Sequence, residues 1–200
     1  TNYNTLTWKQ KVKKHNYDVL LGHEVSYRST EYLLGEAMGF PFDQMGNDNM
    51  GLGATPSKVE STFYDKTLLS FYARTNYNYD NRYLFTATVR ADGSTVFSSN
   101  KKWGFFPSFS AAWRVSEEAS MKDVKWIPNF KIRLGWGTVG NDNIPNYLSL
   151  DLYEANKYGI GNSSVTVLKP KQLRNKNLKW EGSNTTNLGI DLGFFDNRLN

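Results

Sequence analysis

Three consecutive segments between Phe71 and Val115 alternate between mostly apolar and mostly polar side chains, and this alternation constrains the fold more than any other feature. The apolar positions are every second residue of Phe71–Tyr79, Tyr83–Ala91 and Phe105–Val115. Because successive side chains of a strand point to opposite faces, the pattern predicts a sheet with one apolar and one polar face. Strands of about ten residues suit a membrane barrel as readily as a soluble one.

Aromatic residues dominate the apolar part of the composition. They make up 15% of the 200 residues, against 39% for all hydrophobic residues. This weighting favours strands, and aromatic girdles are typical of outer-membrane barrels. No apolar run reaches the roughly 20 residues of a transmembrane helix, and the negative mean hydropathy is compatible with a barrel because half of each strand faces a polar lumen. Cysteine is absent, which excludes a disulfide framework and a cysteine-based metal site.

The flanking segments extend the strand pattern toward both ends. Residues 1–34 read as a hairpin with a short connection near residues 14–16, and further strands are expected at residues 130–137 and 186–194. The chain starts within a strand pattern without a signal peptide and stops just after a turn. We therefore expect it to be a piece of a longer protein.

Two long irregular segments are expected between strands. Glycine, proline and asparagine are frequent from residue 35 to about residue 62. A second irregular segment runs from about residue 139 to residue 180, with room for short strands around residues 148–158 and 164–168. Loops of this length are usually functional or mobile.

The opposite side of the sheet is expected to carry short connections. Tyr79–Tyr83 and Phe195–Leu199 repeat an Asp-Asn-Arg turn, and Asp and Asn suit the backbone angles of tight turns. Ser116 is expected to cap a short helix with two glutamates in its first turn and Lys122 near its end. Short turns on one side and long loops on the other are typical of outer-membrane barrels, whose turns face the periplasm.

Several segments resemble one family of barrels. In order and spacing over most of residues 65–200 they are similar to SusC/RagA-type TonB-dependent transporters from the outer membranes of Bacteroides-like bacteria, and residues 1–30 fit less distinctively. The segments are Tyr77–Leu84, Arg90–Ser94, Trp103–Ser108, Ala112–Arg114, Lys131–Gly137, Val139–Asn141, Leu178–Glu181 and Asn187–Asp191.

The resemblance implies a fold and a function. We expect an all-β chain, a section over residues 1–200 of an antiparallel transmembrane β-barrel with long extracellular loops and short periplasmic turns. The plug domain and TonB box of such transporters are expected to be absent from this chain. The implied function is import of a large nutrient, a glycan or a peptide, across the cell outer membrane with a SusD-like surface lipoprotein and energy from TonB. No cofactor and no enzymatic activity are implied.

Four charged residues on the polar face are the candidate site. Arg74, Arg90, Asp92 and Arg114 are expected to face the lumen, where they either line a water-filled wall and dock the plug or contact the substrate directly. Aromatic residues expected in loops could stack on sugars, contact the lipoprotein or pack the loop; they are Trp103, Tyr147 and Tyr153.

Other residue types give little chemistry. His15 and His23 lack metal-ligand spacing. Glu117 and Glu118 are sequence neighbours, which do not face each other on a helix, so no acid/base pair is predicted. The Asn- and Asp-rich segments Gly46–Asn49 and Gly140–Asn143 suggest calcium loops but lack the EF-hand pattern, and turn chemistry explains both.

The net charge of +5 and its lysine clusters at Lys9–Lys14 and Lys169–Lys179 are interpreted as solvated faces, not as a nucleic-acid site. Two other functions remain open. A soluble β-sandwich or lectin-like module would bind carbohydrate through exposed aromatics and bury the apolar positions in a core. A β-rich glycoside hydrolase would need two carboxylates about 5–9.5 Å apart in a cleft, and no such pair stands out.

Overall fold

The computed structural model describes residues 1–42, 49–121, 124, 126–161 and 163–194. The chain divides into two units, one of Thr1–Ser26 with Leu68–Asn200 and one of Tyr27–Thr67. Two neighbouring strands, β2 and β3, contribute residues to both units. Each unit is described by itself.

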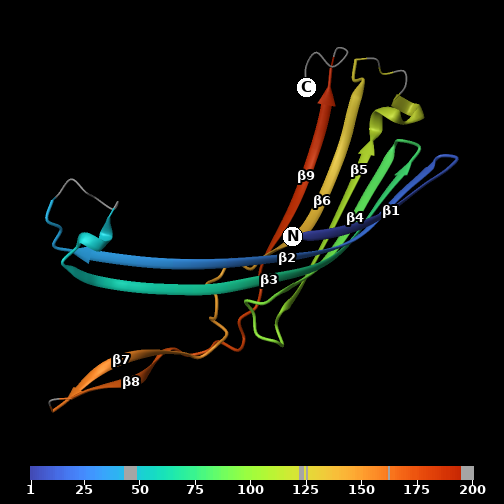
Figure 1. The fold of residues 1–200 in the computed structure, drawn as a ribbon. Helices are drawn as coiled ribbons and strands as arrows, with labels where there is room; N and C mark the ends of the chain where they lie inside the picture. Colours follow the sequence, from blue (N-terminus) through green and yellow to red (C-terminus); the bar gives the residue numbers. More distant parts are fainter. Residues whose placement is uncertain (43–48, 122–123, 125, 162, 195–200) are drawn as a thin grey trace. The chain divides into compact units, whose positions relative to one another are not determined.

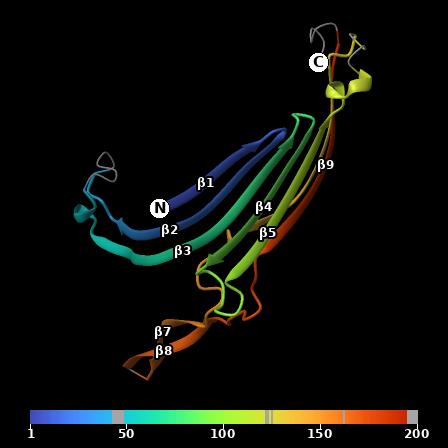
Figure 2. The ribbon, with the colours of Figure 1, turned by 90° about the vertical axis from the view of Figure 1, so that its right-hand side faces the viewer.

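Seven strands form the main sheet, in the order β1-β2-β3-β4-β5-β6-β9. Consecutive strands lie side by side (Figures 1 and 2), and the pairs β1–β2, β3–β4, β4–β5, β5–β6 and β6–β9 are antiparallel. This confirms the predicted all-β antiparallel architecture. The strands are β1 (Asn2–Val12), β2 (His15–Met38), β3 (Thr55–Tyr79), β4 (Tyr83–Ser94), β5 (Trp103–Arg114), β6 (Asn129–Asn141) and β9 (Glu181–Gly193).

The irregular segments are shorter than the sequence suggested. Strand β2 continues to Met38 and β3 begins at Thr55, so the predicted loop over residues 35–62 is wrong at both ends. A strand tolerates a glycine or a proline where its backbone is not needed by a neighbour, and composition alone therefore overestimated the loop. At 24 and 25 residues, β2 and β3 are about twice as long as the 9–11 residues that cross a bilayer.

The segment between β6 and β9 contains a separate hairpin. Strands β7 (Leu152–Ile160) and β8 (Ser163–Gln172) form a two-stranded antiparallel sheet. Short strands were expected at about these positions, and this prediction is confirmed with bounds that differ by several residues. The second irregular segment, expected over residues 139–180, is thus bounded by β6 and β9 and partly regular.

Two tight turns join strands at one end of the sheet. Val12 pairs with His15 across a two-residue turn in which Lys13 has a φ of 53°, so the turn lies slightly before the expected position. Tyr79 pairs with Tyr83, and Asp80 and the residue after it have φ values of 53° and 55°. Asp and Asn reach this left-handed region more readily than most residues. The repeat of this turn at residues 195–199 lies outside the described residues.

The third connection on this side carries two 3₁₀ helices, η3 (Val115–Glu117) and η4 (Ala119–Met121). The predicted helix capped by Ser116 is therefore wrong in type. The residue before η3 is Arg114, no side chain caps it, and Glu118 ends it in an extended conformation. The expected Lys122 lies outside the described residues.

The unit of residues 27–67 contains the far ends of β2 and β3 and a 3₁₀ helix, η2 (Met50–Leu52). Its backbone closes through a hydrogen bond of 3.3 Å from the Ala54 amide to the Gly39 carbonyl. The φ of Gly39 is 75°, which glycine adopts without strain.

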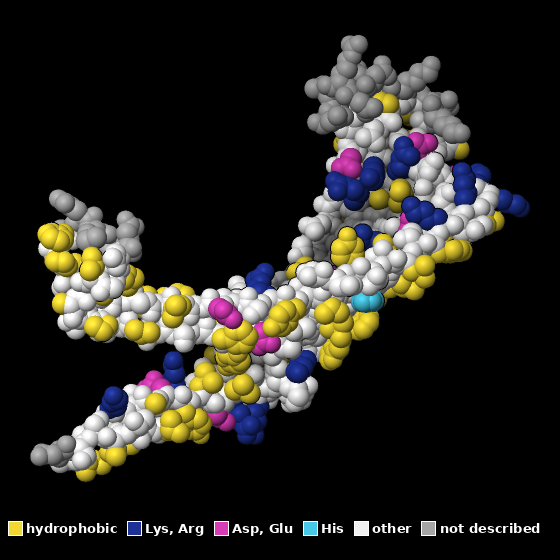
Figure 3. Space-filling model, viewed as in Figure 1, with side chains coloured by type: hydrophobic (Ala, Val, Ile, Leu, Met, Phe, Trp, Pro, Cys, Tyr) yellow, Lys and Arg dark blue, Asp and Glu magenta, His cyan; other side chains and the backbone are white. Residues whose placement is uncertain are grey.

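The main sheet has almost no dry core. Among the described residues, Val96 and Phe97 are the only buried hydrophobic side chains, and both lie in the connection between β4 and β5. Many large hydrophobic side chains are instead exposed over the strands, as the yellow side chains in Figure 3 show. Where a water-soluble domain would hide these side chains, this sheet presents them outward.

Candidate functional site

One face of the main sheet is apolar and uncovered. Six of its apolar positions are 39–60% exposed. Strand register places them on one face, since Phe85 pairs with Ala111, Val89 with Pro107 and Leu134 with Leu188. The soluble sandwich would bury these side chains, so their exposure favours a lipid-facing surface. The six positions are Phe85, Val89, Phe109, Trp113, Leu134 and Ile190.

Aromatic rings border this face at both ends. At the end with the tight turns, Tyr83 lies 6.2 Å from Tyr79 and 6.4 Å from Trp113, measured between ring centroids. At the other end, Phe71 stacks on Trp103 at 6.2 Å. Trp103 was expected in a loop, but it is the first residue of β5 and belongs to this border.

The spacing of the two borders matches a bilayer. Trp103 and Trp113 lie ten residues apart on β5. At about 3.3 Å per residue this is roughly 33 Å along the strand, or about 25 Å along the membrane normal for a strand tilted by about 40°. The apolar band of outer-membrane barrels has about this height, also about 25 Å.

The other face is polar and carries a compact charged cluster. Arg90 donates from Nε to both carboxylate oxygens of Asp92, at 2.7 and 2.9 Å, and from Nη2 to Ser70 Oγ at 2.9 Å. A carboxylate oxygen of Glu24 lies 3.4 Å from the same guanidinium, and the Tyr72 ring lies beneath it, with its centroid 5.5 Å away. Ser70 and Asp92 are buried. We call these five residues the inner cluster.

Strand register assembles the inner cluster. Tyr72 of β3 pairs with Arg90 of β4, and Ser70 pairs with Asp92, so all four share one face. Glycine at position 22 of β2 makes room for the Tyr72 ring, because a Cβ atom there would overlap the ring. The phenol therefore lies over Gly22, with the Arg90 guanidinium above the face of its ring.

The four predicted site residues do not form one site. Arg74 faces the same side as Arg90 and donates to Thr88 Oγ1 at 3.3 Å, so it lies beside the inner cluster. Arg114 lies at the far end of β5, where it donates to the Asn81 carbonyl at 3.2 Å and pairs with Glu117 at 2.7 Å. The structure thus brings three of the four together on one wall and places Arg114 at the tight-turn end.

Sequence reasoning missed part of this polar face. Arg133 forms a bidentate ion pair with Asp191, at 2.8 and 2.7 Å, and its guanidinium lies over Gly189. Glu24, Ser70 and Tyr72 were also not predicted. The alternation in β6 and β9 could have identified Arg133 and Asp191, since both occupy polar-face positions.

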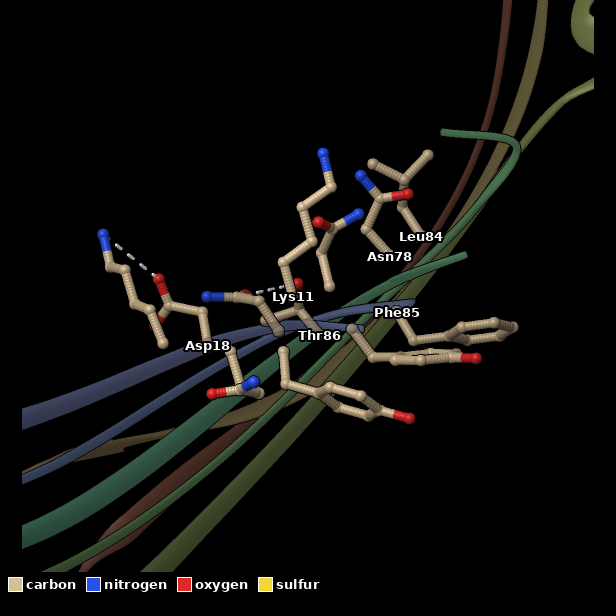
Figure 4. A pocket seen from close by; sticks show the side chains of 12 residues that line it. Lys11, Asp18, Asn78, Leu84, Phe85 and Thr86 are labelled. Atoms are coloured by element: carbon tan, nitrogen blue, oxygen red, sulfur yellow. Dashed lines mark hydrogen bonds and ion pairs between the residues drawn. The ribbon is translucent and has the colours of Figure 1, made fainter. Parts of the chain in front are cut away.

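A hollow opens beside the first strands of the sheet (Figure 4), with a volume of about 560 Å³. Lys11, Asp18 and Asn78 point to one side of the ribbon and Phe85 to the other. Its lining residues are Lys9, Gln10, Lys11, Asn16, Tyr17, Asp18, Asn76, Tyr77, Asn78, Leu84, Phe85 and Thr86. Charged, amide and aromatic groups line the hollow together because its residues come from both faces of the sheet.

A second network links the three connections at the tight-turn end. Glu118 accepts hydrogen bonds from the Tyr83 hydroxyl at 2.6 Å, Trp113 Nε1 at 3.1 Å and Arg82 Nη1 at 2.9 Å. Asp80 accepts from Lys14 Nζ at 2.8 Å and from Arg82 Nη2 at 2.7 Å. We call these residues, Lys14, Asp80, Arg82, Tyr83, Trp113 and Glu118, the rim network.

Hydrogen bonding sets the titration of the carboxylates in the rim network. The Tyr83 hydroxyl, followed by Trp113 and Arg82, lowers the pKa of Glu118 below its ordinary value. The Lys14 ammonium, with Arg82, lowers the pKa of Asp80 in the same way. Both carboxylates therefore stay ionised at pH values where exposed ones begin to take up protons.

Acid should weaken this end of the sheet. Since the folded pKa of Glu118 is lowered, its contribution is fully present above the ordinary carboxylate pKa and is lost as the pH falls through the lowered value. We expect the melting temperature of the full-length protein, followed by its heat-dependent migration in SDS, to fall toward acid. Glu118→Gln should melt lower at neutral pH and decline less steeply.

The matched control for this measurement is Glu117→Gln, which leaves the three hydrogen bonds to Glu118 intact. It should keep the acid-dependent decline of the original protein. Parallel melting curves for Glu118→Gln and the original protein across the whole pH range would contradict this role of Glu118.

The remaining candidates have structural partners. His15 Nδ1 lies 2.9 Å from the Tyr77 hydroxyl, and His23 Nε2 lies 3.2 Å from an Asn4 amide nitrogen. Within Gly140–Asn143 an Asn side chain accepts a backbone N–H at 2.9 Å, which is the expected turn chemistry. Most of Gly46–Asn49 lies outside the described residues.

In the part of the chain that the structure describes, no three His, Cys, Asp or Glu side chains gather in a way that could hold a metal ion. Among the same residues, no helix has the length and apolar character needed to cross a membrane.

A family model and several known proteins match this chain. Residues 1–200 match the family described as TonB dependent receptor-like, beta-barrel. The TonB-dependent receptor SusC of Bacteroides thetaiotaomicron is 44% identical over 138 residues, which cover 66% of this chain and 14% of SusC. TonB-dependent receptor P3 of Formosa agariphila is 34% identical over 196 residues, covering 98% of this chain and 20% of P3.

A solved structure shares the fold. The structure of the RagAB peptide transporter matches with a TM-score of 0.85 and 27% identity, covering 98% of this chain and 22% of the matched chain. The chain therefore spans about a fifth of the length of such relatives.

Proposed function

Because the chain belongs to the TonB-dependent receptor family and forms part of the wall of an outer-membrane β-barrel, we propose that it serves a transporter that imports a large nutrient without changing it chemically. The observation that carries the proposal is the two-faced sheet. Its apolar face has aromatic borders about one bilayer apart, and its polar face holds an ion-paired cluster. A wall of this kind separates lipid from a polar passage.

The nutrient class we propose is a glycan or a peptide. A relative of the chain is SusC, and the matched solved structure is that of a peptide transporter. The proposed partners are a SusD-like surface lipoprotein, which captures the nutrient, and TonB, which acts through a region of the protein outside this chain. Neither nucleic acid nor catalysis has a place in this function.

The polar face supplies the proposed inner lining. Arg74, Arg90 and Asp92 would face the passage or the domain that fills it, with Arg114 nearer its periplasmic end. Asp92 compensates the charge of Arg90, and Glu117 compensates that of Arg114, while Arg74 donates to a neutral hydroxyl. A lining whose charges are mostly paired suits a passage that lets water and solute through without binding either tightly.

Uptake by cells tests this proposal. A strain that lacks the full-length receptor should lose uptake of labelled oligosaccharides or peptides that its parent accumulates, and the intact gene should restore it. Deleting tonB should abolish the same uptake while leaving the receptor in the outer-membrane fraction. Uptake that persists without TonB, or a labelled nutrient that the purified receptor cleaves, would overturn the proposal.

A further inference from the structure

The net charge of the chain is concentrated in two connections. Residues 93–102 and 142–180 together carry eight basic and three acidic residues, a net charge of +5, which equals that of the whole chain. The remaining residues of the chain contain equal numbers of basic and acidic side chains. We call these two segments the basic loops. The basic residues are Lys101, Lys102, Lys157, Lys169, Lys171, Arg174, Lys176 and Lys179.

The acidic residues of the basic loops are already engaged. Asp151 lies 3.4 Å from Arg174, and Glu154 lies 3.5 Å from Lys169. The third, Asp142, accepts a hydrogen bond from Ser94 at 2.8 Å. Six lysines remain, and none of them forms an ion pair with a carboxylate of the described residues. Five of these six, all but Lys102, are exposed.

A small apolar core fixes the basic loops. The Trp180 ring lies between Phe97 and Phe106, with both ring centroids 5.2 Å from its own. Its Nε1 donates to the Lys102 carbonyl at 2.9 Å, and Ser149 donates to the Val96 carbonyl at 3.3 Å. The two connections are therefore packed against each other, and Lys101, Lys102 and Lys179 lie around one anchor.

This anchor lies on the polar side of the sheet. Phe106 pairs with Arg90, the centre of the inner cluster, and therefore shares its face. Glycines at positions 104 and 140 make room for the Phe106 ring, because a Cβ atom at either would overlap it. The basic loops thus lie at the mouth of the polar face, beyond the aromatic border at Trp103.

We propose that the basic loops select a nutrient that carries negative charge, an oligosaccharide bearing carboxylate or sulfate groups. This deepens the proposed function, on which it rests. Uncompensated charges of one sign at the mouth of a passage raise the local concentration of oppositely charged ligands. The hairpin β7–β8 adds two phenol rings, those of Tyr153 and Tyr158, that are more than 60% exposed. By strand alternation Tyr153 shares one face of the hairpin with Lys157, and a flat ring on the same face as an ammonium group suits a sugar ring with an acidic substituent.

Binding to the purified full-length receptor in detergent tests the inference without TonB. The probes are fluorescent oligogalacturonate, maltodextrin of matched length and polyglutamate. Oligogalacturonate should bind and should outcompete maltodextrin. Its affinity should fall as salt is added. Replacing Lys101, Lys171, Lys176 and Lys179 by Gln should weaken its binding at least about fourfold, since each exposed ion pair contributes a small factor that multiplies over four sites.

Two variants separate charge from loop position. The first variant replaces Lys9, Lys11 and Lys13, on β1 and its turn, by Gln. It removes three positive charges from another part of the sheet and should leave binding unchanged. Trp180→Ala keeps every lysine but removes the anchor, and it should also weaken oligogalacturonate binding, while heat-dependent migration in SDS confirms that the barrel has folded.

The outcomes separate this inference from the proposed function. Equal binding of maltodextrin and oligogalacturonate, or no effect of the four substitutions, would overturn the anionic selectivity while TonB-dependent uptake could still stand. Tighter binding of polyglutamate than of oligogalacturonate would overturn the claim that the ligand is a sugar, while the selection for negative charge would stand. Salt-sensitive binding of oligogalacturonate together with uptake that ignores TonB would overturn the proposed function and support the inference.

Discussion

Val89→Arg is expected to prevent assembly of the full-length receptor in the outer membrane. Val89 pairs with Pro107, close to the middle of the stretch between Trp103 and Trp113, and its side chain is exposed on the apolar face. An arginine near the bilayer centre costs about 2–4 kcal/mol on the lipid side of a barrel. The measurement is the amount of heat-modifiable receptor in the outer-membrane fraction, which should fall strongly.

Ser110→Arg is the matched control. Ser110 lies on β5, where it pairs with Thr86 on the polar face, and it is exposed. The same arginine there meets a polar lumen and should assemble normally. If the two variants assembled equally well, the assignment of the faces would be wrong, and if only the control failed, the faces would be reversed.

Arg90→Gln is expected to produce the second large effect. The substitution leaves the buried Asp92 carboxylate without its cation. In the original protein Arg90 contacts both Asp92 and Glu24, and without it these two carboxylates lie near each other uncompensated. We expect a loss of about 2 kcal/mol in the free energy of unfolding, below the roughly 3–5 kcal/mol of a fully buried pair because Arg90 is 37% exposed. Urea unfolding of the purified receptor measures this loss.

A double-mutant cycle isolates the pair. Asp92→Asn alone should cost less than Arg90→Gln, because the guanidinium keeps Glu24 and Ser70 as partners. The double variant should be more stable than the sum of the two single losses predicts. Strictly additive losses would show that Arg90 and Asp92 do not stabilise each other, and the inner cluster would then be a set of independent surface groups.

The sheet was predictable because alternation is a local property of the sequence. Phe71–Val115 shows period two in every strand, and the structure has β3, β4 and β5 there. The far ends of β2 and β3 were not predicted as strands, since Gly35 and Pro56 resemble loop residues, and strand pairing outweighed composition there. Composition does not separate loop from strand where glycine and proline lie inside long paired strands.

The predicted helix after Ser116 failed for a tertiary reason. Its acidic residues fit a helix start, but Glu118 accepts hydrogen bonds from Tyr83 of β4 and from Arg82 of the turn before it, and its backbone is extended where a helix would continue. Contacts distant in sequence decided this conformation, and no local pattern shows them.

The candidate site was predictable in part. Arg90 and Asp92 are two residues apart on one strand, so period two places them on one face without further information. Ser70, Tyr72 and Glu24 join them only through the pairing of β3 with β4 and the position of β2, which the alternation does not specify. Arg114 shares their face, and its distance along the strand is what separates it from them.

The rim network forms only in the correct strand register, so it favours that register during assembly. Slipping one strand by a single residue exchanges its lipid and lumen faces and turns polar side chains toward the lipid. Such a slip between β4 and β5 would also move Glu118 away from Arg82 and Tyr83, and one between β2 and β3 would separate Lys14 from Asp80. The hydrogen bonds of the rim network between neighbouring hairpins therefore form only when the strands are in the correct register.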